Sequence, residues 1–110
     1  MIRALLIAAV FAAGPALAHR FNVFAWVDGT EVVVEAKFAS GARPKIGAVR
    51  VYDAADRLIR TMGLDEQGSA RFPLEGAEGG LRIEVDAGDG HADYWILTPA
   101  DIARGAGGEG

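Results

Sequence analysis

Two histidines are the residues of this sequence best suited to bind a transition-metal ion. The chain has no cysteine, and His19 and His91 are its only histidines. His19 follows Ala16-Leu17-Ala18, which has the small-x-small form that signal peptidase cleaves. Cleavage after Ala18 would make His19 the first residue of the mature chain. Its α-amine and its imidazole Nδ1 would then offer two nitrogen donors on one residue.

His91 stands at the end of a glycine-rich turn, Gly88-Asp89-Gly90, and Asp93 lies two residues beyond it. In a β-sandwich the first and last strands can lie near each other, which would bring His19 and His91 together. Asp89 and Asp93 flank His91 and would add a carboxylate oxygen. Such a nitrogen-rich set suits Ni²⁺, Co²⁺ or Cu²⁺ better than Mg²⁺ or Ca²⁺. The alternative is that His19 only marks the cleavage point and His91 is an ordinary loop residue.

The first 18 residues have the features of a cleaved signal peptide. Arg3 supplies a positive charge, residues 4–13 form an unbroken apolar run, and Gly14-Pro15 breaks any helix before the cleavage site. The rival interpretation is an uncleaved membrane anchor. A spanning helix needs about 20 apolar residues, and this run is shorter. We therefore predict that residues 1–18 are removed and that a mature chain of residues 19–110 is exported to the periplasm.

Composition narrows the function of the mature chain. Without Arg3 it carries 10 Lys and Arg against 15 Asp and Glu, a formal net charge of −5. This charge argues against nucleic acid and against anionic membrane surfaces, which both reward a basic patch. The lack of cysteine excludes disulfides, thiolate metal sites and a cysteine nucleophile. Neither Ser40 nor Ser69 has a plausible His/Asp arrangement around it, so we expect a protein that is not an enzyme.

Short alternating segments predict an all-β fold. Between Glu31 and Phe38 apolar and polar residues alternate, as in a half-buried antiparallel strand. Asp28-Gly29 predicts a hairpin turn, and Asp65-Glu66-Gln67-Gly68 predicts a second one. We expect seven strands, near residues 21–27, 31–38, 48–52, 57–62, 69–74, 81–86 and 91–97. Seven short strands with regular turns are typical of an antiparallel β-sandwich of the prealbumin or immunoglobulin type.

The strand phase also predicts which side chains are buried. Phe72 and Ile83 fall on inward-facing positions of their strands, and Trp26, Tyr94 and Trp95 are expected in the core or at its edge. Residues 21–27 are apolar on both faces, which is typical of a central strand. The sandwich is predicted to span residues 19–99. Residues 100–110 are predicted to form a flexible, glycine-rich tail; a single helical turn at residues 100–104 is the alternative for its start.

The segment His19-Arg20-Phe21-Asn22-Val23-Phe24-Ala25-Trp26-Val27-Asp28-Gly29 resembles the mature start of small periplasmic components of nickel/cobalt uptake systems. These components accompany the energy-coupling-factor type of ABC transporter. The similarity continues through residues 49–53, 64–68 and 88–94. The resemblance implies a prealbumin-like or carboxypeptidase-regulatory-like sandwich with an accessory role in uptake of Ni²⁺ or Co²⁺. It also implies a membrane permease as partner.

Three functions remain open at this point. The first is a non-catalytic periplasmic accessory protein that presents Ni²⁺ or Co²⁺ to a permease, or braces that permease from outside. The second is a metal-free interaction module with the same sandwich. The third is a periplasmic copper-binding protein that uses His19. Because the ion itself largely sets the order of affinities, the donor set alone does not choose among nickel, cobalt and copper.

Overall fold

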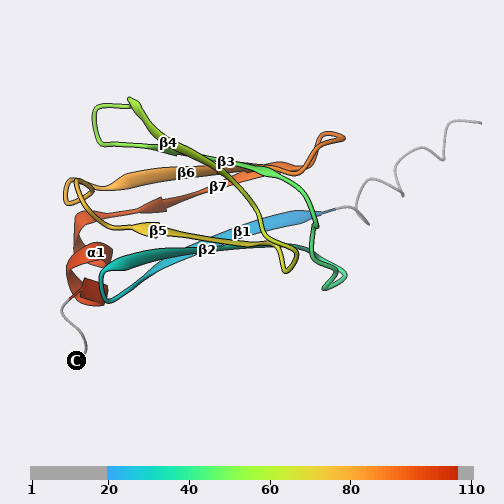
Figure 1. Ribbon diagram of the computed structural model, residues 1–110, viewed down its shortest axis with the longest axis horizontal. Helices are drawn as coiled ribbons and strands as arrows, with labels where there is room; N and C mark the ends of the chain where they lie inside the picture. The colour runs from blue at the N-terminus through green and yellow to red at the C-terminus, as the bar shows by residue number, and fades with distance from the viewer. Residues whose placement is uncertain (1–19, 107–110) are drawn as a thin grey trace, which may run out of the picture.

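The computed structural model describes residues 20–106; the predicted signal peptide and His19 lie outside these described residues. Seven strands form two antiparallel sheets, and one short helix follows them (Figure 1). The predicted all-β sandwich is confirmed. The elements are β1 (Phe21–Asp28), β2 (Glu31–Phe38), β3 (Ala48–Tyr52), β4 (Leu58–Gly63), β5 (Ser69–Pro73), β6 (Leu81–Asp86), β7 (Ala92–Leu97) and α1 (Pro99–Ala106).

The sheets contain three and four strands, in the orders β1-β2-β5 and β4-β3-β6-β7. This topology differs from the sequence interpretation in two ways. First, β1 is an edge strand and not a central one, although its sequence is apolar on both faces. Second, the turn at residues 65–68 does not close a hairpin, because β4 and β5 belong to different sheets. The chain crosses between the sheets there, and β5 pairs with β2 instead.

The core lies between the two sheets and is built mainly from β-branched residues. Strands β2, β3 and β6 supply the largest fully buried side chains, namely Val32, Val34, Val49, Val51, Ile83 and Val85. Such side chains pack well on a pleated surface. Phe72 and Ile83, which the strand phase places inward, are 3% and 0% exposed. The alternation in the sequence therefore identified the inner face of these strands correctly.

The turn between β1 and β2 shows how glycine sets the register of this hairpin. Asp28 pairs with Glu31, so the loop consists of two residues, Gly29 and Thr30. Gly29 has a φ of +67°, a conformation that glycine adopts without steric cost. The tight loop fixes the pairing of Phe21 with Phe38 at the far end of the hairpin.

Residues 100–106, which the sequence analysis assigned to a flexible tail with one helical turn, belong to helix α1; residues 107–110 of that tail lie outside the described residues. Thr98 Oγ1 accepts a hydrogen bond from the Asp101 backbone N–H at 3.1 Å, and Asp101 Oδ2 accepts one from the Thr98 N–H at 3.1 Å. This reciprocal arrangement is a capping box, and Pro99 occupies the first helical position, where it is favoured. Ile102 is 4% exposed and belongs to the core. A cap and one buried side chain thus hold this segment on the sandwich.

The edge strands of the two sheets lie side by side at one corner and approach each other through side chains at the other. β1 lies beside β7 at one of them, where the Phe24 and Trp95 ring centroids are 5.7 Å apart. At the other, the guanidinium of Arg60 in β4 lies 5.5 Å from the ring centroid of Phe72 in β5. The start of β1 and the turn between β6 and β7 lie at one end of the sandwich, and α1 lies at the opposite end (Figure 1). Within residues 20–106, no helix has the length and apolar character needed to cross a bilayer.

Candidate metal centre

The turn between β6 and β7 determines where His91 lies. The Ala87 N–H donates to the His91 carbonyl at 2.8 Å, and the His91 N–H donates to the Gly88 carbonyl at 2.9 Å. Gly88, Asp89 and Gly90 have φ values of +87°, +55° and +81°. Positive φ values belong to the left-handed region of backbone conformation, which glycine adopts freely and aspartate tolerates better than most residues. This composition allows three successive residues with positive φ. The turn therefore reverses the chain sharply and places His91 just before β7.

The imidazole of His91 packs against two phenylalanine rings. Its centroid is 5.0 Å from that of Phe38, with an interplanar angle of 87°, and 6.3 Å from that of Phe21. The Phe21 and Phe38 rings are themselves 5.3 Å apart. Edge-to-face contacts of this kind are favoured for aromatic pairs. The half-buried imidazole is thereby held beside the first residue of β1.

The chain just before β1 is also anchored. The Ala39 backbone N–H donates to the Arg20 carbonyl at 2.8 Å, which extends the pairing between β1 and β2 by one residue. His19 is bonded to Arg20 and lies outside the described residues. An extended chain advances about 3.3–3.6 Å per residue. Only Arg20 separates His19 from Phe21, so the donors of His19 are attached to the chain within about two residue lengths of Phe21. The ring of Phe21 in turn contacts His91.

The two aspartates of the predicted set differ in position. Asp89 is exposed in the turn, whereas Asp93 is half-buried in β7 and pairs with Val85 of β6. Side chains two residues apart in an extended chain point to the same side, so the side chains of Asp93 and His91 are expected on the same side of the chain. Asp86, which the sequence interpretation did not consider, accepts a hydrogen bond from the Gly88 N–H at 2.8 Å and stabilises the turn.

Within residues 20–106, no three His, Asp or Glu side chains are grouped so that they alone could hold a metal ion. His91, Asp89 and Asp93 therefore do not form a complete site by themselves. The predicted set also requires the α-amine and imidazole of His19. The nitrogen-rich site stays a prediction, with one of its two histidines placed by the structure.

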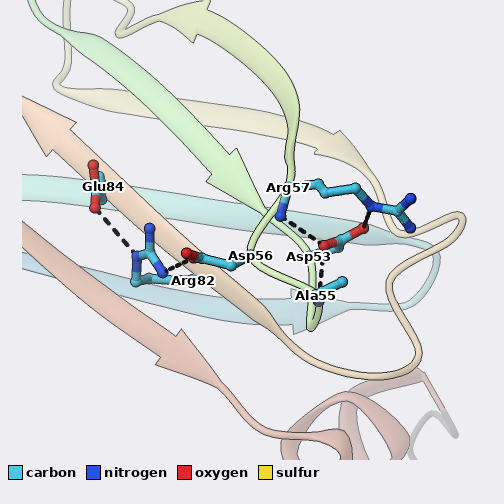
Figure 2. A network of polar contacts seen from close by, with 6 residues as sticks. All are labelled: Asp53, Ala55, Asp56, Arg57, Arg82 and Glu84. Carbon is cyan, nitrogen blue, oxygen red and sulfur yellow. Dashed lines mark hydrogen bonds and ion pairs between the residues drawn. The ribbon is translucent and has the colours of Figure 1, made fainter.

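A second polar cluster, not predicted from the sequence, lies between the β3–β4 turn and β6 (Figure 2). Arg82 contacts both Asp56 and Glu84, and its guanidinium carbon lies 4.2 Å above the ring centroid of Tyr52. The hydrogen bond to Asp56 is the largest cause that raises the pKa of Arg82 above its ordinary value. With both carboxylates and the ring around it, this arginine links the turn to the sheet.

The same figure shows how Asp53 organises the β3–β4 turn. Its Oδ1 accepts hydrogen bonds from the N–H groups of Ala55 and Arg57, both at 2.9 Å, and its Oδ2 accepts one from Arg57 Nε at 3.3 Å. The bond from the Arg57 backbone is the main cause that lowers the pKa of Asp53. These interactions satisfy the carboxylate within the turn, and we assign it a structural role.

The largest departure from the sequence interpretation concerns the aromatic residues. Trp26 is 44% exposed, Trp95 37% and Tyr94 56%, so none of the three is in the core. Trp26 and Trp95 line one groove of about 340 Å³ between β1, β7 and α1, with Asp101 and Arg104 beside them. The sequence does contain a signal of this exposed surface, because β1 and β7 carry consecutive apolar residues in place of a regular alternation. An edge strand that is apolar on both faces must expose one of them.

No family model, no curated protein and no solved structure matches this chain. The resemblance to periplasmic components of nickel/cobalt uptake systems therefore stays a prediction from the quoted motifs.

Proposed function

We propose that the chain is an exported, non-catalytic accessory protein of nickel or cobalt uptake. In this proposal it binds one divalent ion as cargo at the start of the mature chain and presents that ion to a membrane permease. The ligands are the α-amine and imidazole of His19 and the imidazole of His91. Asp89 or Asp93 adds a carboxylate oxygen. The periplasmic location and the permease come from the predicted signal peptide and from the resemblance.

One observation carries the metal proposal. The imidazole of His91 lies beside Phe21, only two residues after His19, even though 72 positions separate the two histidines in the sequence. The α-amine and imidazole of His19 belong to the same residue, so the second donor closes a chelate ring at little further entropic cost. A third nitrogen from His91 would then join the start of β1 to the turn before β7.

The aromatic contacts of His91 fit a ligand role as well as a packing role. Phe21 and Phe38 restrict the orientation of the ring, so little side-chain freedom remains to be lost when an ion binds. This restriction concerns His91, the histidine of the proposed site that lies within the described residues. The alternative that uses copper differs only in the ion, because Cu²⁺ accepts the same nitrogen donors.

The direct test is calorimetric titration of the protein exported with its own leader and recovered from the periplasm, after N-terminal sequencing has established that it starts at His19. We expect one ion of Ni²⁺, Co²⁺ or Cu²⁺ per chain at neutral pH. Affinity should fall steeply from about pH 8 to pH 6, because protons compete with the ion for the amine and imidazole nitrogens. A chain that retains one extra residue before His19 should bind much more weakly, because its amine is displaced.

Two substitutions separate ligation from packing. His91→Phe keeps an aromatic ring against Phe38 and removes both ring nitrogens, so affinity should fall by at least about tenfold while the fold is retained. Asp56→Asn, in the distant β3–β4 turn, should leave affinity unchanged; asparagine tolerates the +66° φ of that position. If an authentic His19 start binds none of the three ions, the metal proposal is wrong, and a metal-free interaction module takes its place.

A further inference from the structure

The line along which β1 lies beside β7, which we call the seam, joins the two sheets without a hydrogen-bonded pair of strands. β1 is hydrogen-bonded to β2 and β7 to β6, so the two strands of the seam meet through side chains. Both strands run from the end of the sandwich that carries the β6–β7 turn toward α1 (Figure 1). The ring contact of Phe21 with His91 and that of Phe24 with Trp95 follow one another along the seam. A residue between His91 and Trp95 therefore lies beside the first half of β1.

Asp93 lies between these two contacts and is on the inner face of its sheet. It pairs with Val85 in the register of β6 and β7, and directly opposed residues of antiparallel strands have their side chains on the same face. Val85 is 0% exposed, so this face is the inner one. The imidazole of His91 reaches the same side, because it packs against Phe21 and Phe38 of the core and its edge. A carboxylate and an imidazole therefore stand two residues apart on the inner side of the seam.

The half-buried acidic side chains of this protein are otherwise paired with arginines. Within residues 20–106, five half-buried acidic residues form such ion pairs, namely Glu31, Glu35, Asp53, Glu84 and Asp101. Asp93 is half-buried as well, but none of the ion pairs in this part of the chain includes it. Removing a carboxylate from water is costly unless a cation compensates the charge. Asp93 thus lacks the counter-charge that the comparable residues have, whereas Asp89 is exposed and needs none.

We infer that Asp93, and not Asp89, is the carboxylate ligand of the proposed ion, and that the bound ion connects the two sheets across the seam. This inference rests on the proposed function, because it needs the donors of His19. A divalent ion would supply the counter-charge of Asp93, and Ni²⁺ and Co²⁺ bind sites that combine nitrogen and oxygen donors. His19 precedes β1 of one sheet, whereas His91 and Asp93 belong to β7 of the other sheet and to the turn before it. Coordination by both groups would therefore hold together two strands that are not hydrogen-bonded to each other.

Two matched substitutions test the choice of ligand. Asp93→Asn and Asp89→Asn each remove one charge from the same segment, and asparagine tolerates the +55° φ of residue 89. In Ni²⁺ calorimetry of the exported protein with its authentic His19 start, Asp93→Asn should weaken binding by at least about tenfold. Asp89→Asn should leave the affinity unchanged. The visible absorption of the Co²⁺-loaded protein, which depends on the set of ligands, should change in Asp93→Asn only.

Stability and hydrogen exchange separate ligation across the seam from a folding defect. Without an ion, Asp93→Asn should be as stable as the parent protein or more so, because an unpaired half-buried charge is removed. With Ni²⁺, the parent protein should gain thermal stability by mass action, and Asp93→Asn should gain less. Ni²⁺ should also slow hydrogen exchange in the first half of β1 more than in β4, the edge strand at the other corner. Asp93→Leu, which has no oxygen to donate, repeats each of these tests.

The outcomes distinguish failure of this inference from failure of the proposed function. If the parent protein binds no ion, the proposed function fails and the inference fails with it. If the parent protein binds Ni²⁺ and Asp93→Asn binds it equally well, the metal proposal stands and the inference alone is overturned. A loss of affinity in Asp89→Asn, alone or equal to that in Asp93→Asn, also overturns it, because the carboxylate would then act from the turn or through charge alone. Tight binding that slows exchange in β1 no more than in β4 would show that the ion does not connect the sheets.

Discussion

At one corner of the sandwich β4 approaches β5, and at the other β1 lies beside β7. The β4/β5 corner carries several features that discourage pairing with another strand. Ile59 is an extra residue in β4 where the register with β3 shifts, and Arg60 turns inward over Phe72. β5 ends in Pro73, which has no N–H to donate to a further strand. A bulge, an inward-pointing charge and a proline are recognised means of protecting a sheet edge.

The strands of the β1/β7 corner lack these features where they are most apolar. Residues 21–27 of β1 and 94–97 of β7 contain no charged residue and no proline. Their register with β2 and β6 is also continuous. The corner instead presents exposed aromatic side chains beside a groove. The comparison teaches that these means of protecting a sheet edge are present at one corner only.

The largest effect that separates the corners should come from Phe72→Ala. Phe72 is 3% exposed and lies beneath Arg60, so truncation leaves a cavity in the core. We expect the free energy of unfolding in urea to fall by about 3–5 kcal/mol. The control is Leu58→Ala in the neighbouring strand, which is 51% exposed and should cost no more than about 0.5 kcal/mol. Equal losses in the two variants would contradict the assignment of Phe72 to the core.

The sequence predicted the strands and their inner faces because both depend on local alternation. It also predicted the hairpin of β1 with β2 at Asp28-Gly29, but it did not predict how the other strands are divided between the two sheets. The turn at residues 65–68 has the same composition whether it closes a hairpin or crosses between sheets, so β4 and β5 looked like partners. The edge position of β1 was missed for the same reason. Being apolar on both faces is typical of a central strand and equally fits an edge strand that exposes aromatic residues.

The candidate metal site was likewise predictable only where local sequence features define it. His91 was identified from residue type and from the turn before it, which are local features. Its packing against Phe21 and Phe38 depends on bringing together strands that are far apart in the sequence. Helix α1 was predicted only as a single turn at residues 100–104, because the glycines after Pro99 made a longer helix look unfavourable. The residues that start the helix, Thr98 and Asp101, were nevertheless present to indicate it.

The next largest effect should come from Gly105→Ala, where α1 rests against β1. A Cβ at this position would lie 2.5 Å from the Val27 Cβ and 2.8 Å from the Val27 carbonyl oxygen. In an open helix this substitution gains about 1 kcal/mol. Here the clash with Val27 should reverse the sign and destabilise the protein by about 1–2 kcal/mol. Thermal unfolding followed by tryptophan fluorescence measures the change.

The control for this substitution is Ala103→Gly, at an exposed position of the same helix. It should cost about 0.5–1 kcal/mol through helix propensity alone and leave the tryptophan spectrum of the folded state unchanged. If Gly105→Ala stabilises the protein, α1 does not rest on Val27, and the groove lined by Trp26 and Trp95 has a different wall.

Arg60→Leu should have a smaller effect on stability and a visible effect on solubility. Loss of the contact between the guanidinium and the Phe72 ring should change the free energy of unfolding by no more than about 1 kcal/mol. The inward charge that protects β4 disappears, so turbidity at high concentration should increase. Arg50→Leu, in the interior strand β3, is the control and should not increase turbidity. If both variants remain equally clear, the protection of the β4/β5 corner does not depend on Arg60.

The smallest effect concerns two carboxylates that accept backbone hydrogen bonds, Asp53 in the β3–β4 turn and Asp101 at the start of α1. Backbone N–H groups are the first cause that lowers each pKa, from Arg57 in one case and from Thr98 in the other. A carboxylate whose pKa is lowered by folding stabilises the folded state above its unfolded-state pKa. That contribution is lost as the pH falls through the folded-state value.

We therefore expect Asp53→Asn and Asp101→Asn to be slightly less stable than the parent protein at pH 7. Each difference should disappear as the pH falls below about 4, where an unperturbed aspartate becomes protonated. Urea unfolding at a series of pH values measures both differences. Arg57→Ala distinguishes the causes for Asp53, because the backbone N–H of residue 57 remains while the guanidinium is removed. Most of the pH dependence should survive this substitution; if it does not, the ion pair and not the turn sets the pKa of Asp53.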